Sequence, residues 1–449
     1  MCRICFLFSL WLSSLLMFAQ QQQYKGRIVD AETGEPMAYA TLYVSPGHGA
    51  LTNIDGDYVL SAQPTDNVRI SFVGYVTQEV TASALKGVLK MQPLARSLNE
   101  VTVLGTDAIL MRVKDNLRHD FSKNQQRKAH YFCRMTFLKG EQTEMVEAFL
   151  EAKSAVNLRG LCVTNGQYWA KAPEGRVQSE LRNTNLHVNY TLGPMIRGNE
   201  VWKDILIVPF PDEGGSAYIR SNYEMSQTTL SGSRDRTIYA ITLTPKDKKY
   251  IRPMLGGTLY VDAETYHLLR FDGFIYNVNA TATYGDKKEK TRLDIAIKID
   301  YQRKNGYTEV ADISCTAINE DVEFHTVLTN VEEYNLPFTY GEQIDRNLLT
   351  AIERAGSNPE VEGKYVFVER TDRELAVTQE SSDAPVDMVT QRQLDEGEQL
   401  LPQLEQLTDT AGVLSYIRKA MNFGQAYPQE KVYLHLDNTG YFKGETIWF

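Results

Sequence analysis

Short alternating runs separated by turn residues fill the segment from Tyr24 to Leu94, and this pattern constrains the fold of the chain most strongly. Ala38–Val44 alternates over its whole length, so every second side chain shares one face of a strand. No helical period interrupts the segment. We therefore predict a small β-sandwich with strands at residues 25–29, 38–44, 58–60, 68–72 and 88–91.

Turn residues separate these runs at defined positions. Gly34 tolerates a left-handed backbone and Pro36 fixes its own φ angle, so residues 30–36 are expected to form a turn. Asp55 and Gly56 form a second turn, with Asp57 directly after it. We read Asp55 and Asp57 as turn residues, because they lack the number of ligands that a calcium loop needs.

The same segment resembles the carboxypeptidase regulatory-like domain. The resemblance covers about 70 residues and implies a seven-stranded, transthyretin-like sandwich. Such domains are common at the N-terminus of outer-membrane receptors and other envelope proteins of Gram-negative bacteria. Leu98–Gly105 is similar to the strand that follows the domain in those receptors. The matching stretches are Gly26–Asp30, Thr33–Pro36, Ala40–Val44, Thr52–Tyr58 and Ser71–Tyr75.

The chain begins with a pattern typical of a secretory leader. Arg3 precedes an apolar run from Ile4 to Phe18, and Ala19 is the expected cleavage position. The alternative is a retained membrane anchor, but the run is shorter than the roughly 20 residues of a spanning helix. Cys2 and Cys5 precede the apolar run, so neither is the lipidated first residue of a mature lipoprotein.

Charge and cysteine content exclude several classes of protein. The formal net charge of −10 disfavours nonspecific binding of nucleic acid. Beyond the leader, Cys133, Cys162 and Cys315 form no C-x-x-C motif, which excludes zinc ribbons and thioredoxin-like redox motifs. They are either small buried apolar residues or, for Cys133 and Cys162, a disulfide pair.

The region after Gly105 departs from the receptor pattern. Apolar residues spaced for one helical face predict a helix over Asp107–Ser122. Glu144–Val156 is read as a strand pair or a short helix, and a hairpin is expected across Asp262–Thr265. This hairpin is similar to those of lipoprotein-carrier-like envelope domains, in which one curved sheet wraps a helix. Further strands are predicted at residues 131–137, 217–219, 238–243, 257–261, 268–276, 293–301 and 308–315.

The last hundred residues are more polar and then turn aromatic. Thr378–Val386 lacks hydrophobic periodicity and is the expected linker, and helices are predicted at Gln391–Leu407 and Gly412–Met421. Val432–Asp437 and Gly444–Phe449 resemble the opening of a macroglobulin-like domain. Since a strand ending on three apolar residues has nothing to bury them, we expect the sequence to be part of a longer protein.

Motifs for catalysis are absent from the sequence. None of the seven histidines lies in H-x-x-E or H-E-x-x-H, and neither G-x-S-x-G nor a phosphate-binding loop occurs. His435 is expected to be structural, and the basic turns at 246–249 and 287–290 to be solvated loops. Several aromatic residues could stack on sugar rings but are better explained by core packing: Trp169, Trp202, Tyr218, Tyr223 and Tyr276.

We therefore expect a mainly β protein with no catalytic, cofactor-binding or metal-binding residues. The leading hypothesis is an exported, non-enzymatic scaffold of the periplasm or outer membrane. It would bind envelope proteins or an extracellular peptide or glycan polymer, bind no nucleic acid, and meet the membrane only through partners. The alternatives are the periplasmic part of a TonB-dependent transporter and a hydrolase whose catalytic domain lies elsewhere.

The expected organisation has six parts. A single strand is expected to follow the sandwich, then an α+β domain with a curved antiparallel sheet, and then a helical connector. The parts are the signal peptide 1–19, the sandwich 24–94, the connecting strand 95–105, the middle domain 106–340, the linker and connector 341–425, and the partial C-terminal β-sandwich 426–449.

Overall fold

The computed structural model describes residues 22–97, 105–124, 127–154, 158–171, 215–231, 237–246, 254–284, 287–319, 322–334, 336, 342–343, 348–356 and 367–380. The chain divides into two compact units, and all of these residues belong to the unit made of Met1–Gly175 and Ser179–Pro385. The predicted leader, the helices at 391–407 and 412–421, and the macroglobulin-like segment lie outside the described residues.

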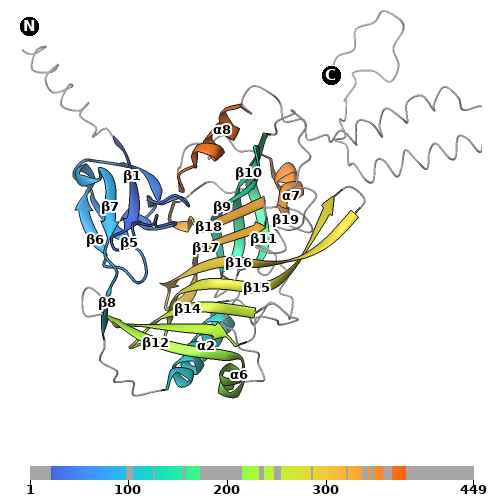
Figure 1. Ribbon diagram of the computed structural model, residues 1–449. Coiled ribbons are helices and arrows are strands. Elements are labelled where there is room, and N and C mark those ends of the chain that lie inside the picture. Colours follow the sequence, from blue (N-terminus) through green and yellow to red (C-terminus); the bar gives the residue numbers. More distant parts are fainter. Residues whose placement is uncertain are drawn as a thin grey trace, which may run out of the picture. The chain divides into compact units, whose positions relative to one another are not determined.

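The N-terminal strands form a sandwich of two sheets (Figure 1). One sheet has the order β4-β1-β7 and the other the order β3-β2-β5-β6, so the seven-stranded sandwich that the resemblance implies is confirmed. Strands β3 and β6 were not predicted, because each is only four residues long. The strands are β1 Gln22–Asp30, β2 Thr41–Ser45, β3 His48–Leu51, β4 Asp57–Ala62, β5 Asn67–Ser71, β6 Gln78–Thr81 and β7 Gly87–Met91.

Alternation along these strands produces the core of the sandwich. Ile28, Leu42 and Ile70 have no exposed surface, and Tyr58 is 1% exposed. Gly26 makes room for this tyrosine, since a Cβ atom there would lie 2.6 Å from the Tyr58 hydroxyl oxygen. A bulky residue in the Gly26 position would therefore displace either the ring or strand β1.

Asp30 holds the first turn in place. Its carboxylate accepts hydrogen bonds from the backbone N–H groups of Glu32 (2.7 Å) and Thr33 (3.1 Å). The hydroxyl of Tyr75 donates to the other carboxylate oxygen at 2.5 Å, and this bond lowers the pKa of Asp30. Residues 30 and 75 stand at opposite ends of the segment used for the sequence resemblance, and the fold joins them directly.

A twelve-stranded sheet follows the sandwich in the same compact unit. Its order is β19-β11-β10-β9-β18-β17-β16-β15-β14-β13-β12-β8, and the paired strands are antiparallel. The strands are β8 Ala95–Ser97, β9 Lys128–Lys139, β10 Gln142–Ser154, β11 Leu158–Lys171, β12 Tyr223–Ser231, β13 Thr237–Pro245, β14 Met254–Asp262, β15 Leu268–Tyr284, β16 Lys287–Lys304, β17 Tyr307–Asn319, β18 Val322–Asn330 and β19 Glu342–Gln343.

Helices pack against this sheet. The predicted helix is confirmed as α2 (Thr106–Asn124), which contacts β17 and β12. Helix α7 (Leu348–Ala355) packs on β11, where a Cβ atom on Gly166 would lie 2.8 Å from Ile352. The other helices of the described residues are α6 Gly215–Asn222, α8 Asp372–Glu380 and the short turns η1 Ala82–Ala84 and η3 Glu332–Tyr334.

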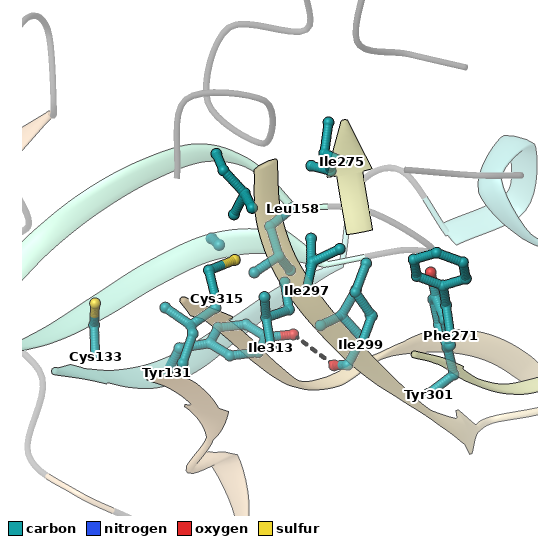
Figure 2. Close-up of a cluster of buried hydrophobic side chains, with 14 of the residues drawn as sticks. Tyr131, Cys133, Leu158, Phe271, Ile275, Ile297, Ile299, Tyr301, Ile313 and Cys315 are labelled. Carbon is teal, nitrogen blue, oxygen red and sulfur yellow. Dashed lines mark hydrogen bonds between the residues drawn. The ribbon is translucent and has the colours of Figure 1, made fainter. Parts of the chain in front are cut away.

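One face of the sheet and helix α2 share a continuous apolar core. Figure 2 shows part of its strand side chains. Ile297, Ile299 and Ile313 lie close together in it, and each is less than 5% exposed. The hydroxyl of buried Tyr131 donates to the carbonyl oxygen of Val310 at 3.0 Å. The strand residues that alternate with these core positions lie on the opposite face, and that face carries the charged groups described below.

Two predicted elements of the middle domain are wrong, and the expected linker Thr378–Val386 begins inside helix α8, which ends at Glu380. Residues 217–219 are not a strand, because they lie within helix α6, whose buried Ile219 packs into the core. Glu144–Val156 is neither a strand pair nor a helix: residues 142–154 form the single long strand β10. In both segments, hydrophobic periodicity alone does not separate helix from strand.

The strand that leaves the sandwich joins the edge of the large sheet. Ala95, Arg96 and Ser97 pair antiparallel with β12. Only this part of the predicted connecting strand 95–105 is described, together with Gly105. The sandwich is therefore followed directly by the twelve-stranded sheet.

Candidate functional site

The sequence predicts no catalytic, cofactor-binding or metal-binding residues. Among the described residues, no group of three or more His, Cys, Asp or Glu side chains is placed to hold a metal ion. Within the same residues, no helix is long and apolar enough to cross a membrane. Several buried and half-buried charged groups lie where the sandwich meets the large sheet.

A row of polar residues crosses four neighbouring strands at this junction. Arg270 on β15 is opposite Asp300 on β16, Asp300 is opposite Asp312 on β17, and Asp312 is opposite Thr329 on β18. The guanidinium of Arg270 donates to both carboxylate oxygens of Asp300, at 2.6 and 2.8 Å. Two parallel charge-assisted bonds of this kind fix the orientation of the guanidinium plane.

The same guanidinium also contacts the sandwich. Its central carbon lies 3.8 Å from the ring centroid of Phe72, and the Nζ atom of Lys298 lies 4.8 Å from that centroid. Arg270 Nη1 also reaches the backbone oxygen of Val73 at 3.5 Å. Phe72 therefore packs over two cations of the sheet, and such cation–π contacts strengthen as water is excluded.

Asp312 is the most perturbed carboxyl group of the row. Burial raises its pKa, and the neighbouring charge of Asp300 raises it further, to about 7. The hydroxyl of Thr329 donates to Asp312 Oδ1. Two carboxyl groups this close do not both ionise readily, so one proton is retained near neutral pH.

A second contact is made by the segment before helix α8. The backbone N–H of Leu51, on the edge strand β3, donates to the carbonyl oxygen of Phe367 at 2.7 Å, and Leu51 forms a parallel bridge with Val368. Leu51, Phe367 and Val368 belong to one apolar cluster that also contains Phe132 and Phe149 of the sheet. We call residues 367–371 the strap, because they contact both the sandwich and the sheet.

A buried ion pair holds the strap on the sheet. Arg134 Nη2 donates to the Val368 carbonyl oxygen at 2.8 Å and Nη1 to the Glu369 carbonyl oxygen at 3.0 Å. The carboxylate of Glu147 accepts bonds from Arg134 (2.8 Å) and from Arg370 (3.1 and 2.7 Å). Burial raises the pKa of Glu147, but the two guanidinium groups outweigh it and lower the pKa.

Helix α8 starts with a capping box. The hydroxyl of Thr371 accepts from the backbone N–H of Glu374 at 3.3 Å, and Glu374 accepts from the backbone N–H of Thr371 at 2.9 Å. The hydroxyl of Thr136 donates to the same carboxylate at 2.5 Å. The start of α8 is thus bonded to β9 as well as capped.

Two clefts flank the junction. The first, of about 370 Å³, has Tyr43 and Arg69 of the sandwich on one side and Lys304 and Asp312 of the sheet on the other. The second, of about 350 Å³, lies between Tyr39 of the sandwich, the start of α8, and strands β9 and β18. Both clefts are partly open to solvent, and they are bordered by the contacts that hold the sandwich.

Beside the second cleft, a hydroxyl, an imidazole and a carboxylate are linked in the same order as in a catalytic triad. Thr316 Oγ1 lies 3.2 Å from His325 Nδ1, and His325 Nε2 lies 3.1 Å from Glu323 Oε2. Thr316 is paired on both sides, with Ala296 and with His325, so its strand is inside the ladder. A hydroxyl nucleophile needs backbone N–H donors beside it for the oxyanion, and a paired strand uses those donors in the sheet. The trio is therefore read as a surface hydrogen-bond chain.

The residues singled out in the sequence have structural positions. Asn53 Oδ1 accepts from the backbone N–H groups of Asp55 (3.0 Å) and Asp57 (2.9 Å), which makes the segment a turn. Lys246 donates to the Arg220 carbonyl oxygen at 2.6 Å. His435, Trp202 and residues 247–249 lie outside the described residues, as do the side chains of Tyr218 and of residues 287–290.

The remaining aromatic residues divide between core and surface. Tyr223 is 3% exposed in the core of the large sheet. Arg370 lies over the ring of Trp169, with its central carbon 5.2 Å from the centroid. Tyr276 stacks against Phe274 on the opposite face from the core. Phe274 was not selected from the sequence, although strict alternation along residues 271–276 would have placed it outside.

The Cys133–Cys162 disulfide is not formed. Cys133 and Cys315 are buried free thiols, as expected for small apolar residues. Cys133 is opposite Ala148 on β10, whereas Cys162 on β11 is opposite Glu151 of that strand. The two cysteines are thus separated by a strand and offset along it, beyond disulfide reach.

Comparisons with known proteins cover parts of the chain. The CarboxypepD_reg-like domain matches residues 24–103. The TonB-dependent receptor SusC from Bacteroides thetaiotaomicron is 38% identical over 93 residues, which is 20% of this chain and 9% of the receptor.

Solved structures were compared with the fold as well. A LolA superfamily protein from Nitrosomonas europaea is 12% identical and covers 53% of this chain and 99% of its own, with a TM-score of 0.22. The MucA/MucB complex of Pseudomonas aeruginosa is 11% identical and covers 56% of this chain and 97% of its own, with a TM-score of 0.17. Scores of this size carry no argument about fold or function.

Proposed function

Residues 24–103 belong to the CarboxypepD_reg-like domain family, and from this premise we propose that the chain is an exported, non-catalytic binding protein of the cell envelope. The similarity to a TonB-dependent receptor supports an envelope location. The leader-like sequence of residues 1–19 supports export. In this proposal the sandwich and the large sheet form one rigid platform that binds envelope proteins or an extracellular polymer.

The observation that carries the proposal is the closed junction. Arg270 is bonded to Asp300 and stacked on Phe72, and the strap bonds the other side of the sandwich through Leu51. A regulatory-like module held on two sides is suited to presenting a fixed surface. The proposal of a non-enzymatic role rests on this architecture, in which the sandwich is held on the sheet from two sides. It does not rest on the absence of a metal cluster among the described residues.

Fractionation tests the proposal. The chain, expressed in a Gram-negative host with its own N-terminus and a C-terminal tag, is expected in the periplasmic or outer-membrane fraction. N-terminal sequencing is expected to begin at or within two residues after Ala19. A full-length product that stays in the cytoplasm with an uncleaved N-terminus would contradict the proposal.

The receptor match favours a second candidate, the periplasmic part of a TonB-dependent transporter. Washing membranes with sodium carbonate distinguishes the two. A scaffold that reaches the membrane only through partners is released by the wash, whereas an integral transporter stays in the pellet. Release of the full-length gene product into the supernatant supports the scaffold.

A further inference from the structure

An exposed aromatic and aliphatic patch lies on the sheet face opposite the apolar core. Phe271 and Ile275 point into the core, so Phe274 and Tyr276 lie on the other face of β15. Their rings stack with centroids 5.6 Å apart and an interplanar angle of 19°. Phe274 is 43% exposed, an unusual fraction for a phenylalanine in a long strand.

Ile318 extends this surface across the sheet. Phe274 is opposite Ala296 on β16, and Ala296 is opposite Thr316 on β17. Ile318 follows on the same face of β17, since Cys315 and Ala317 belong to the core, and it is 59% exposed. Adjacent strands are about 4.8 Å apart, so Phe274 and Ile318 lie two strands apart within reach of one bound segment.

Carboxylates border the patch. Asp272 precedes Phe274 on the same face, and its side chain is 44% exposed. Burial raises the pKa of the Tyr276 hydroxyl, and the nearby charge of Asp294 raises it further. The Asp294 side chain is exposed. Glu323 is opposite Ile318 on β18, with its side chain 47% exposed. Each has a neighbour: Lys298 lies 3.8 Å from Asp272, His325 lies 3.1 Å from Glu323, and the backbone N–H of Asn277 donates to Asp294 at 3.0 Å.

We propose that the Phe274–Ile318 patch is a docking surface for a cationic peptide segment of a partner protein, one that alternates aliphatic residues with arginine or lysine. Aromatic rings beside carboxylates attract guanidinium and ammonium groups, both through the ring faces and through charge-assisted bonds. The aliphatic residues of the segment cover Ile318 and the edge of Phe274. The proposal gives a partner chemistry to the binding role proposed above and rests on it.

A binding measurement on the full mature chain tests this inference. The probe is a fluorescein-labelled peptide with three Leu-Arg repeats, compared by fluorescence anisotropy with the same peptide carrying Glu in place of Arg. We expect binding of the arginine peptide only. Raising the salt concentration from 0.05 to 0.5 M should weaken its binding by about tenfold, because the rim charges are exposed and screened.

Matched variants locate the binding. The double variant Phe274→Ala/Ile318→Ala is expected to weaken binding at least about tenfold, and Glu323→Gln or Asp294→Asn about two- to fivefold each. Val88→Ala is the control, since Val88 is 58% exposed but lies on β7 of the sandwich. Urea unfolding of each variant should match that of the wild type, because these side chains are on the surface.

Three outcomes would overturn the inference: equal binding of the glutamate peptide, equal loss in Val88→Ala, or a wild-type dimer that Phe274→Ala/Ile318→Ala converts to a monomer. The last outcome would assign the patch to a second copy of this chain. None of them changes where the chain fractionates, so failure of this inference and failure of the proposed function are distinguishable.

Discussion

Asp300 and Asp312 lie directly opposite each other on β16 and β17, and only Asp300 has a guanidinium partner. Like charges directly opposite on neighbouring strands destabilise a sheet. Here the pair is tolerated because Arg270 neutralises one carboxylate, while the other holds its proton with a pKa raised to about 7. This arrangement lies beneath the contact with Phe72 and makes that contact sensitive to pH and to substitution.

The first prediction concerns pH. The pKa of Asp312 in the folded protein is above its ordinary value of 3.8, so the folded state binds the proton more tightly than the unfolded state. This contribution to the free energy of unfolding is fully present below about pH 4 and is lost as the pH rises towards 7. Asp312→Asn has no carboxyl group to titrate. Its free energy of unfolding relative to the wild type should therefore be higher at pH 8 than at pH 5 by on the order of 2 kcal/mol. Urea unfolding of both proteins at the two pH values measures this. Parallel stability changes in wild type and variant would refute the assignment.

The second prediction concerns Arg270. Arg270→Met removes the partner of half-buried Asp300 and the stacking on Phe72, and is expected to cost about 3–5 kcal/mol of unfolding free energy. The control is Arg27→Met, which breaks an exposed ion pair with Asp57 and should cost less than about 1 kcal/mol. Chemical denaturation provides both values. Similar losses in the two variants would show that the junction pair has no special weight.

The third prediction concerns Gly47. Its φ angle is +71°, and a Cβ atom there would overlap the carbonyl oxygen of Glu333 across the junction. Gly34 has a similar φ of +77° but no neighbour within 4 Å, so Gly34→Ala measures backbone strain alone. We expect Gly34→Ala to cost about 1 kcal/mol and Gly47→Ala about 1–3 kcal/mol more. Limited proteolysis should also cleave Gly47→Ala faster between sandwich and sheet. Equal effects of the two substitutions would mean that the contact with Glu333 is loose.

The fourth prediction concerns the strap. Glu147→Gln leaves buried Arg134 and half-buried Arg370 beside a neutral amide and is expected to cost about 2–4 kcal/mol. Hydrogen exchange should accelerate at Leu51, whose N–H bonds to the strap, more than at Ile70 inside the sandwich. Lys128→Gln, which breaks a more exposed pair with Glu151, is the control. Unchanged exchange at Leu51 would show that the ion pair of Glu147 does not hold the strap against the sandwich.

The fifth prediction concerns the thiols. Burial raises the pKa of Cys315 to about 12 and also raises that of Cys133, so neither is a thiolate at pH 8. In the folded mature chain, a thiol reagent such as dithionitrobenzoate should label no more than one cysteine, and mass spectrometry should place that label on Cys162. Unfolding in urea should expose all three. A non-reducing digest that contains a peptide linked through Cys133 and Cys162 would contradict the structure.

Local patterns predicted much of this fold. Alternation around Leu42 and Ile70, together with the turns at Gly34 and Gly56, predicted the sandwich, and the spacing of Val113 and Leu117 predicted α2. Ile219 was misassigned because three apolar residues fit a helix and a strand equally well. Strands β11, β12 and β18 were not predicted, since their polar residues interrupt alternation.

The junction was out of reach of the sequence. Arg270 and Phe72 are almost two hundred residues apart, and no local pattern links them. The row from Arg270 to Thr329 depends on the register of four strands, which is set by tertiary pairing. Polar residues on strands read as solvent-facing in a sequence, so burial under a second module removes the signal that would have marked them.

The short pairing of β8 with β12 has a mechanical consequence. The chain leaving the sandwich enters the ladder at once, through three residue pairs between Ala95–Ser97 and Thr229–Ser231 (Figure 1). A pulling force on the sandwich is therefore borne by hydrogen bonds of the large sheet, with no slack tether to stretch first. Separating the two modules would require breaking the hydrogen bonds between β8 and β12 at the edge of the sheet. A force applied to the sandwich is therefore transmitted directly to the sheet.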